Sequence, residues 1–325
     1  MLEIALTDSV DNLCDYTFNF HWQNQELDPA SKVPHQKNTE YTYRELVDEL
    51  KRGGEVHIIG DVGKRFAYSM GVDLKHFGGS GTPERAGTLF VDGNIGAEAG
   101  MGIVSGLLYV SGEVEQPMGN IMEVESDIDG YRKFRSITDI LCNGTGNDVI
   151  LTNSFDEKEK RMVISDGILR GTLAARCSCQ IEIIIEGDAY NGSGLLMQTG
   201  SLIIKGNAGM NTGAHLDGGT VVVRGTVGEF AGAYMKKGVL FFQDAKGYVG
   251  AQMEGGSIYS KKKVKASPPA GKSRMGRDDI SLVRKYMDVG RVESMLYNRY
   301  EVEEEKEKYI TVHMRDGSIV TRKVE

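Results

Sequence analysis

The sequence is poor in residues that cross-link or stiffen a chain, with only 4 cysteines and 6 prolines in 325 residues. The cysteine spacing shows no disulfide framework, so we expect a reducing, cytoplasmic compartment. No apolar run is long enough to span a bilayer, and no signal peptide is recognisable. Acidic residues outnumber basic ones, giving a formal net charge of −8. This balance argues against nucleic acid or an acidic membrane surface as a partner.

Glycine is abundant instead, with 42 residues, and most of it belongs to a repeat. Short apolar strands begin at Ser201, Thr220 and Val239, 19 residues apart, and each is followed by glycines at similar offsets. Units of the same form start at Glu55, Thr88, Leu107 and Glu182. A fixed period near 20 residues with one strand per unit is typical of a solenoid.

Each unit reads as a strand followed by tight turns, because Gly, Asn and Asp tolerate the backbone angles that such turns need. We therefore predict a mainly β fold, a parallel β-helix of about seven recognisable coils. Large aliphatic side chains stand three residues after a small mid-coil residue: Met70, Ile103, Met122, Met197, Leu216, Met235 and Met253. We expect them to form a ladder inside the solenoid; a Met-rich ligand surface is the alternative.

The middle of each strand is apolar or aromatic at the position that should face outward. The residues are His57, Phe90, Tyr109, Ile184, Ile203, Val222 and Phe241. Strands that are apolar on both faces are usually covered on both sides. The sequence leaves open whether the cover is the chain's own non-repeating segments or another protein.

The repeat is interrupted, which divides the chain into five regions. They are an N-terminal strand and capping helix (1–54), first coils (55–125), an α/β insertion or linker (126–180), second coils (181–260), and C-terminal helices with a β-hairpin (261–325). We expect an edge strand over 16–22, a capping box at Thr42 and Glu45, helices over 129–141, 278–287 and 289–300, and a hairpin turn at Asp316 and Gly317. Whether the coils form one stack or two stays open.

Motifs for chemistry are weak. Cys177 and Cys179 lie on one face of a strand, but two thiols without a second pair favour structural cysteines over a metal site. The loop 72–86 contains Gly78–Gly81 without the lysine and helix of a phosphate loop. An independent hydrolase would need Ser80, Ser193, His215 and Asp217 to meet. We therefore predict no catalytic, cofactor-binding or metal-binding residue and no cofactor on this chain.

The runs Gly206-Asn-Ala-Gly-Met-Asn-Thr-Gly213 and Gly225-Thr-Val-Gly-Glu-Phe-Ala-Gly232 resemble the glycine-repeat (GXGXG) β-helix family. That family includes the C-terminal domain of the glutamate synthase large subunit and the β-helical subunit of formylmethanofuran dehydrogenase. The tail 278–296 is similar to the former, whereas the start and the stretch 118–141 are similar to the latter. The resemblance implies a right-handed parallel β-helix that braces catalytic partners and has no catalytic residue of its own.

Three functions follow as hypotheses. The first is a non-catalytic structural subunit of a multi-subunit oxidoreductase, in a methanogenic archaeon if the likeness to formylmethanofuran dehydrogenase holds. Its partners would be catalytic subunits carrying metal, flavin or iron–sulfur centres. The second is a binding module for assembly or activation of a larger enzyme, gripping its partner with the inserted segments 72–86 and 126–180. The third is a hydrolase that acts alone.

Overall fold

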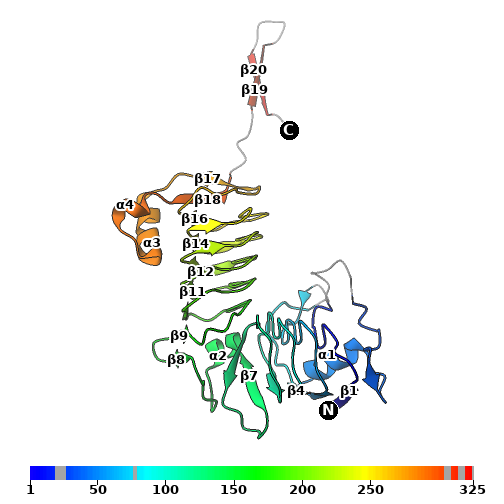
Figure 1. Ribbon diagram of the computed structural model, residues 1–325. Coiled ribbons are helices and arrows are strands. Elements are labelled where there is room, and N and C mark those ends of the chain that lie inside the picture. Colours follow the sequence, from blue (N-terminus) through cyan, green and yellow to red (C-terminus); the bar gives the residue numbers. More distant parts are fainter. Residues whose placement is uncertain (19–26, 76–78, 304–308, 314–318, 324–325) are drawn as a thin grey trace.

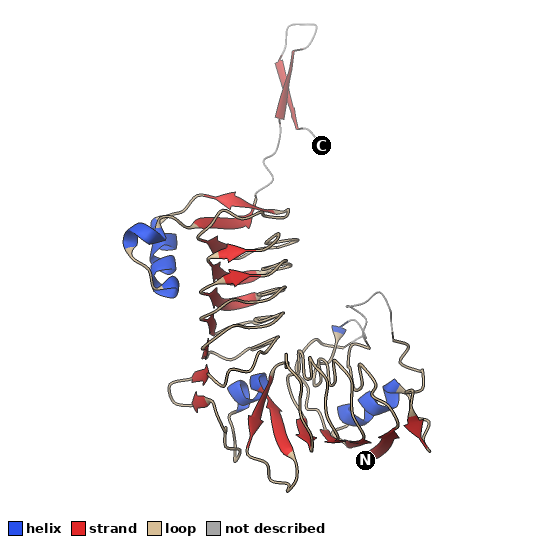
Figure 2. Ribbon diagram, viewed as in Figure 1, coloured by secondary structure: helices blue, strands red, loops and turns tan. Residues whose placement is uncertain are grey.

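The computed structural model describes residues 1–18, 27–75, 79–303, 309–313 and 319–323. It is mainly β and forms a β-solenoid of about nine turns with four helices in the described part, as predicted in class. Two sheets run through two stacks of coils that meet at an angle (Figures 1 and 2). The N-terminal coils form the first stack and the C-terminal coils form the second.

The first sheet contains β1 (Leu2–Leu6), β2 (Gln36–Lys37), β3 (Glu55–Ile59), β4 (Thr88–Asp92), β5 (Leu107–Val110), β6 (Ile121–Val124) and β7 (Arg132–Ser136). The second contains β8 (Ser154–Asp156), β9 (Arg161–Ile164), β10 (Glu182–Ile185), β11 (Ser201–Ile204), β12 (Asp217–Val223), β14 (Lys237–Phe242), β16 (Ser257–Ser260), β17 (Ala270–Ser273) and β18 (Asn298–Val302). The short strands β13 (Thr226–Val227) and β15 (Asp244–Ala245) pair with each other. The closing hairpin has β19 (Tyr309–His313) and β20 (Ile319–Lys323), as predicted, and its turn lies outside the described residues.

Strands of successive coils pair in parallel, in two runs. The first run is β1, β3, β4 and β5, and the second is β9, β10, β11, β12, β14 and β16. Three of these strands, β1, β9 and β16, extend the stacks beyond the seven units found in the sequence. They were missed as coils because the glycine pattern around them is incomplete.

The side of each coil opposite its strand is a row of left-handed residues that alternate along the chain. In one coil these are Phe230, Gly232 and Tyr234, with φ of 58°, 67° and 53°. A Cβ at Gly232 would lie 2.7 Å from the Cδ1 of Ile258, so the middle position faces the packed interior. The predicted ladder of large residues after this position is confirmed, because all seven side chains are at most 1% exposed.

The solenoid is continuous on this turn side and split on its strand side. Met118 of the first stack bridges in parallel to Arg170 of the second. On the strand side, residues 121–156 enter between the two parallel runs; they contain β6, β7, α2 (Ile137–Asn143) and β8. We call this segment the wedge. β7 pairs antiparallel with β5, and β8 pairs antiparallel with β9, so the wedge ends one parallel run and begins the next.

Buried polar groups hold the two stacks together at this joint. Arg170 is 2% exposed and forms two 2.7 Å bonds to Asp166, while its Nε donates to the carbonyl of Ile121. Burial would raise the pKa of Asp166, but the guanidinium of Arg170 outweighs it and the pKa is lowered. Asn120 donates to the carbonyl of Ile103 and accepts from the amide of Ala174. The joint is therefore a fixed, hydrogen-bonded corner.

Helices cover the second stack on its outer strand face. α3 (Arg277–Met287) and the short α4 (Arg291–Ser294) lie beside the strands of that stack (Figure 1). One buried cluster joins residues of the strands and the helical layer: Val222, Phe241, Tyr259, Val283, Met287 and Tyr297. The outward-facing strand residues of these coils, Val222 and Phe241, are thus covered by the chain's own helical segment rather than by another protein. We call the outward-facing mid-strand residues of each stack its outer row.

The N-terminal helix α1 (Tyr43–Lys51) begins with the predicted capping box, in which Thr42 and Glu45 exchange hydrogen bonds. Leu46 and Leu50 on this helix are fully buried in the core of the first stack. The helix therefore supplies part of the core of the first stack.

Three local predictions were wrong. Residues 132–136 form β7 rather than a helix, because Phe134 packs in the first core while Lys133 and Arg135 face other partners. The end of the expected helix over 289–300 is β18, which pairs antiparallel with β16 and closes the second stack. Phe18 is buried in turns rather than in an edge strand, and the rest of that expected strand, 19–22, lies outside the described residues.

The cysteines were also misjudged. Cys142 of α2 and Cys179 form a disulfide, with their Cα atoms 5.4 Å apart. The two positions are 37 residues apart, and nothing in their spacing suggests that the wedge folds back onto the entrance of the second stack. Cys14 and Cys177 are buried free thiols.

Candidate functional site

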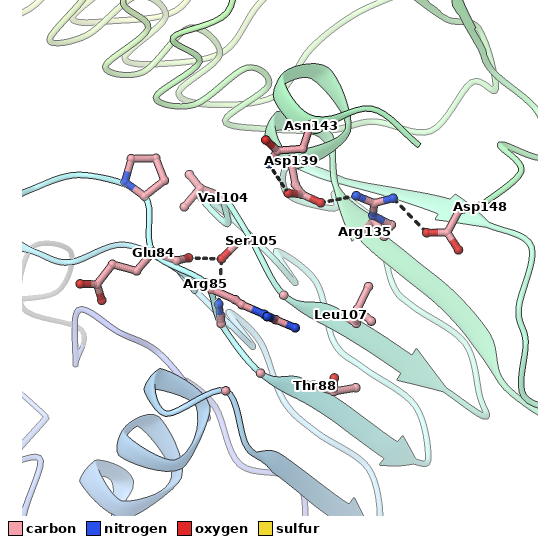
Figure 3. A pocket seen from close by; sticks show the side chains of 15 residues that line it. Glu84, Arg85, Thr88, Val104, Ser105, Leu107, Arg135, Asp139, Asn143 and Asp148 are labelled. Atoms are coloured by element: carbon pink, nitrogen blue, oxygen red, sulfur yellow. Dashed lines mark hydrogen bonds and ion pairs between the residues drawn. The ribbon is translucent and has the colours of Figure 1, made fainter. Parts of the chain in front are cut away.

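A cleft of about 630 Å³ opens where the wedge meets the first stack (Figure 3). The first stack lines it with residues 83–88 and 104–107 and with Gly53. The wedge contributes Arg135, Asp139, Asn143 and Asp148. Both segments that the sequence marked as insertions therefore supply walls of one recess. We call it the joint cleft.

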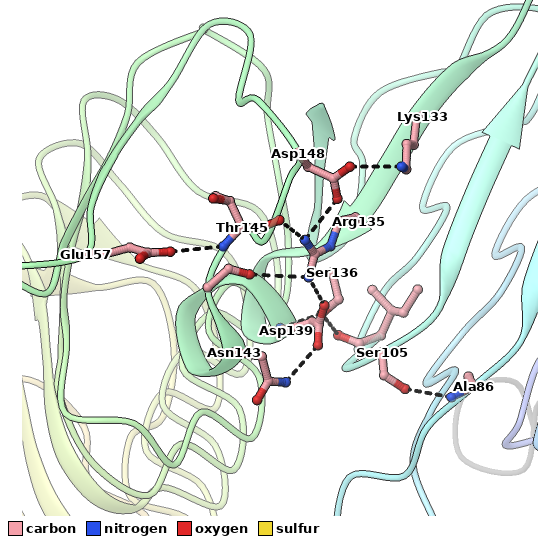
Figure 4. A network of polar contacts seen from close by, with 12 residues as sticks. Ala86, Ser105, Lys133, Arg135, Ser136, Asp139, Asn143, Thr145, Asp148 and Glu157 are labelled. Carbon is pink, nitrogen blue, oxygen red and sulfur yellow. Dashed lines mark hydrogen bonds and ion pairs between the residues drawn. The ribbon is translucent and has the colours of Figure 1, made fainter. Parts of the chain in front are cut away.

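The wedge wall of the joint cleft is a closed network of charges (Figure 4). Arg135 forms ion pairs with Asp139 and with Asp148, the latter at 2.9 Å, and donates to the carbonyl of Thr145 at 2.7 Å. Lys133 contacts the other oxygen of Asp148 at 2.9 Å. Burial would lower the pKa of Arg135, but the two carboxylates outweigh it and raise the pKa. The positive charge of Arg135 is therefore balanced by two carboxylates, and this side chain holds the wedge in shape.

The opposite wall offers one cation with no ion-pair partner among the described residues, Arg85. Its exposed side chain lies in the joint cleft (Figure 3). Beside it, the hydroxyl of Ser105 donates to the carbonyl of Glu84 and accepts from the amide of Ala86 at 3.1 Å. Ser105 thus fixes the backbone that carries Arg85. This arrangement suits the binding of a carboxylate or carbonyl group supplied by another molecule.

The glycine-rich loop uses its amide groups internally. The amides of Gly79 and Ser80 donate to the carbonyl of Leu74 and to the carboxylate of Asp73, and that of Gly81 donates to the carbonyl of Asp73. These are the groups that would face an anion in a phosphate loop. In the described part of the loop they are occupied.

The four side chains considered for a hydrolase have separate structural partners. Ser193 is fully buried and donates to the carbonyl of Tyr190, and Ser80 bonds Thr82. Asp217 lies 3.9 Å from Lys237. The ring of His215 stacks on Tyr234 with a centroid distance of 4.8 Å. Ser80 and Ser193 thus have partners in their own loop or coil, whereas Asp217 and His215 contact the following coil.

A second candidate surface lies on the turn side of the second stack. Four large side chains there are between 40% and 52% exposed: Met210, Phe230, Tyr234 and Tyr248. Phe230 and Tyr248 lie on neighbouring coils, since the amide of Phe230 donates to the carbonyl of Tyr248, and Tyr234 stacks on His215 of the preceding coil. We call these four residues the turn patch.

The backbone under the turn patch keeps the left-handed conformation that recurs at these places in other coils, as at His215 and Gln252, both with φ of 53°. Phe230 and Tyr234 have φ of 58° and 53°, a region that bulky residues rarely enter. The place of Phe230 is taken by Gly192 and Asn211 in the two preceding coils of the row, and both also have positive φ. Sequence reasoning aligned these coils but missed the patch, because periodicity does not show which turn residues point into solvent.

Within the described residues, no helix has both the length and the apolar character needed to cross a membrane. No family model matches the chain. A relative from Methanothermobacter thermautotrophicus (strain ATCC 29096 / DSM 1053 / JCM 10044 / NBRC 100330 / Delta H), described as an uncharacterized protein, is 44% identical over 204 residues. The match covers 62% of this chain and 65% of the relative, so the chain spans less than two thirds of that protein's length.

Among solved structures, the chain is similar to one in the X-ray structure of the formyltransferase/hydrolase complex (FhcABCD) from Methylorubrum extorquens in complex with methylofuran. The two share 16% identity with a TM-score of 0.27, over 90% of this chain and 91% of that chain. A TM-score this low supports no conclusion about the fold or the activity of the present chain.

Proposed function

We propose that this protein is a non-catalytic structural subunit of a multi-subunit oxidoreductase and braces catalytic partner subunits. The sequence resemblance to the β-helical subunit of formylmethanofuran dehydrogenase and to the glutamate synthase GXGXG domain supports this class of role. A methanogenic archaeon is the proposed setting, and partners with metal, flavin or iron–sulfur centres are the proposed catalytic subunits. The observation that carries the proposal is the turn patch.

The turn patch combines exposure with backbone strain. A non-glycine residue in the left-handed region costs about 1–2 kcal/mol, and the packed coils around it hold the residue in that conformation. Phe230 and Tyr234 both occupy this region and leave more than 40% of their surface in solvent. Tyrosine, phenylalanine and methionine are enriched at the centres of protein interfaces. A rigid row of such residues on a solenoid fits a permanent docking face.

The proposal is tested on protein purified at its natural level through a small tag, by native mass spectrometry. We expect stoichiometric partner subunits carrying redox centres. The double variant Phe230→Gly with Tyr234→Gly should lose those partners, while the isolated chain should stay folded, because relieved backbone strain offsets much of the greater freedom of the unfolded chain.

A matched control is Asn211→Gly, which relieves the same backbone conformation in the adjacent coil without removing an aromatic side chain. It should keep the partners. A lone wild-type monomer at natural level, or full partner retention by the double variant, would overturn the proposal.

A second candidate is a binding module that takes part transiently in assembly or activation of a larger enzyme. The joint cleft favours it, because residues 83–86 and 135–148 from the two inserted segments line one recess. Arg85 there has its guanidinium available for a carboxylate of a partner. In this case Arg85→Glu would weaken association, and partners would be found in substoichiometric amounts that dissociate during gel filtration.

A further inference from the structure

The cysteines at the joint bring three sulfurs together from two parts of the chain. Cys142 comes from the last turn of α2 in the wedge, whereas Cys177 and Cys179 come from the segment that enters the second stack. Their three Sγ atoms all lie within 4.8 Å of one another. Cys177 is buried, and the other two are partly exposed.

The backbone around these sulfurs is held independently of the disulfide. The amide of Cys177 donates to Ala174 and its carbonyl accepts from Gln198 at 2.8 Å. α2 is fixed to the same coil because the hydroxyl of Thr138 donates to the carbonyl of Ala175 at 2.8 Å. Reduction of the Cys142–Cys179 bond would therefore leave three thiols facing one small volume.

We infer that the reduced protein binds one zinc-class divalent metal ion through Cys142, Cys177 and Cys179. Zinc–thiolate bonds of about 2.3 Å place the sulfurs of a tetrahedral site about 3.8 Å apart. The three sulfurs lie within 4.8 Å of one another, so small side-chain rotations that separate the two disulfide sulfurs and draw in the third would reach this spacing. The fourth position faces solvent, since Cys142 and Cys179 are partly exposed.

The metal and the disulfide exclude each other at this site. In the disulfide form only Cys177 carries a thiol there, and one ligand cannot hold the ion. Reduction takes two electrons from an added thiol or phosphine, and metal binding then releases the thiol protons to solvent. Either form links α2 to the second stack, so the ion would replace the disulfide as the clamp at the joint.

The test uses the full-length chain, reduced with a phosphine and desalted without oxygen. Cobalt(II) serves as a spectroscopic probe and zinc as its competitor. We expect one equivalent of cobalt to give thiolate charge-transfer and tetrahedral ligand-field bands, and one equivalent of zinc to abolish them. Absence of these bands in the reduced wild type would overturn the inference.

Four variants locate the site. Cys142→Ser, Cys177→Ser and Cys179→Ser should each lose stoichiometric binding, whereas Cys14→Ala in the first-stack core should keep it. Cys177→Ser is the sharpest, because it retains the disulfide pair and so folds under oxidising conditions. Wild-type cobalt spectra from this variant after reduction would contradict a three-thiolate site.

A readout on the wild type alone guards against unfolded variants. Zinc should protect Cys142, Cys177 and Cys179 together from alkylation, as read by peptide mass mapping after reduction. Cys14 serves as an internal reference, with labelling that zinc does not change. Equal labelling of the three cysteines with and without zinc would refute the site.

Discussion

The two stacks use the same coil but cover its outer face differently. In the second stack, Val222 and Phe241 are fully buried beneath α3. In the first stack the corresponding row is His57, Phe90 and Tyr109, and no helix of the described chain packs on it in a buried cluster. The outer row of the first stack is covered only in part, since Tyr109 is buried while His57 and Phe90 are half-buried.

The rings of His57, Phe90 and Tyr109 follow one another along the coils of the first stack. His57 stacks near Phe90 at 4.2 Å between centroids, and Phe90 stacks on Tyr109 at 4.9 Å. Tyr131 of the wedge meets both of the latter edge-on, and Lys133 lies over Tyr109. Aromatic pairs of this geometry contribute about 0.5–1.5 kcal/mol beyond their burial. In both stacks the repeat makes the strand face apolar, while non-repeating segments decide how that face is covered.

Breaking the joint between the two stacks should destabilise the protein more than any other single change. Arg170→Met removes one member of the buried pair with Asp166 and leaves an unpaired carboxylate, which should cost about 3–5 kcal/mol. Hydrogen exchange should report the loss in both stacks near the joint. The exposed pair between Arg161 and Glu182 is the control, since Arg161→Met should cost less than about 1 kcal/mol.

The effect of Arg170→Met should shrink in acid. The folded pKa of Asp166 is lowered from its ordinary value of 3.8, so the pair stabilises the protein above that pH. This contribution is lost as the pH falls through the folded pKa. In the variant the same carboxyl becomes easier to protonate, so the stability gap between variant and wild type should narrow below about pH 4. A gap that stays constant down to pH 2 would show that the ion pair is not its source.

Each stack has one cover residue whose truncation should affect that stack alone. Met287→Ala in α3 should cost about 2–3 kcal/mol, because a buried side chain is truncated beneath the helix layer. Tyr131→Ala, which removes the edge-on ring of the first stack, should cost about 1 kcal/mol. Hydrogen exchange should rise in β14 and β16 for the first variant and in β4 and β5 for the second. Loss of protection in the opposite stack would contradict separate covers.

A glycine stands in the middle of the turn side in most coils, and substitutions there measure how much a Cβ at that position costs in each stack. Gly232→Ala in the second stack places a Cβ against Ile258 in a left-handed conformation and should cost about 1–2 kcal/mol. The first stack already carries Ala67 at this place with φ of 56°. Ala67→Gly should change stability by less than about 1 kcal/mol, because relieved strain is offset by the greater freedom of the unfolded chain. Thermal melting checks both variants.

The sequence predicted the coils because their strands and glycines recur, and it predicted the inner ladder because Met235 and its equivalents keep a fixed offset. It failed at the wedge, where no period exists. There Phe134 has the alternation of a strand within a run that also fits a helix, and pairing with β5 decides the outcome.

The candidate sites were harder to predict for the same reason. The sequence shows Cys177 and Cys179 as a closely spaced pair. Their third partner, Cys142, belongs to a helix that only the tertiary fold brings beside them. Phe230 and Tyr234 lie in recognised coils, yet their strain and exposure are properties of the backbone path. Local sequence patterns therefore predict the repeating coils, whereas a site formed between non-repeating segments can be located only from the tertiary structure.

The helix α1 packs in the core of the first stack, and losing its N-terminal cap should cost least. Thr42→Ala removes both side-chain bonds with Glu45 and should cost about 1 kcal/mol. The pKa of Glu45 is lowered by the backbone amide and then by the hydroxyl of Thr42. The hydrogen bonds of the Glu45 carboxylate therefore stabilise the folded protein above the ordinary pKa of 4.5, and this stabilisation is lost as the pH falls through the folded pKa. Exchange of the α1 amides should be faster in Thr42→Ala at neutral pH, and the difference from wild type should diminish in acid. Unchanged exchange at neutral pH would mean that burial of Leu46 and Leu50 alone holds the helix.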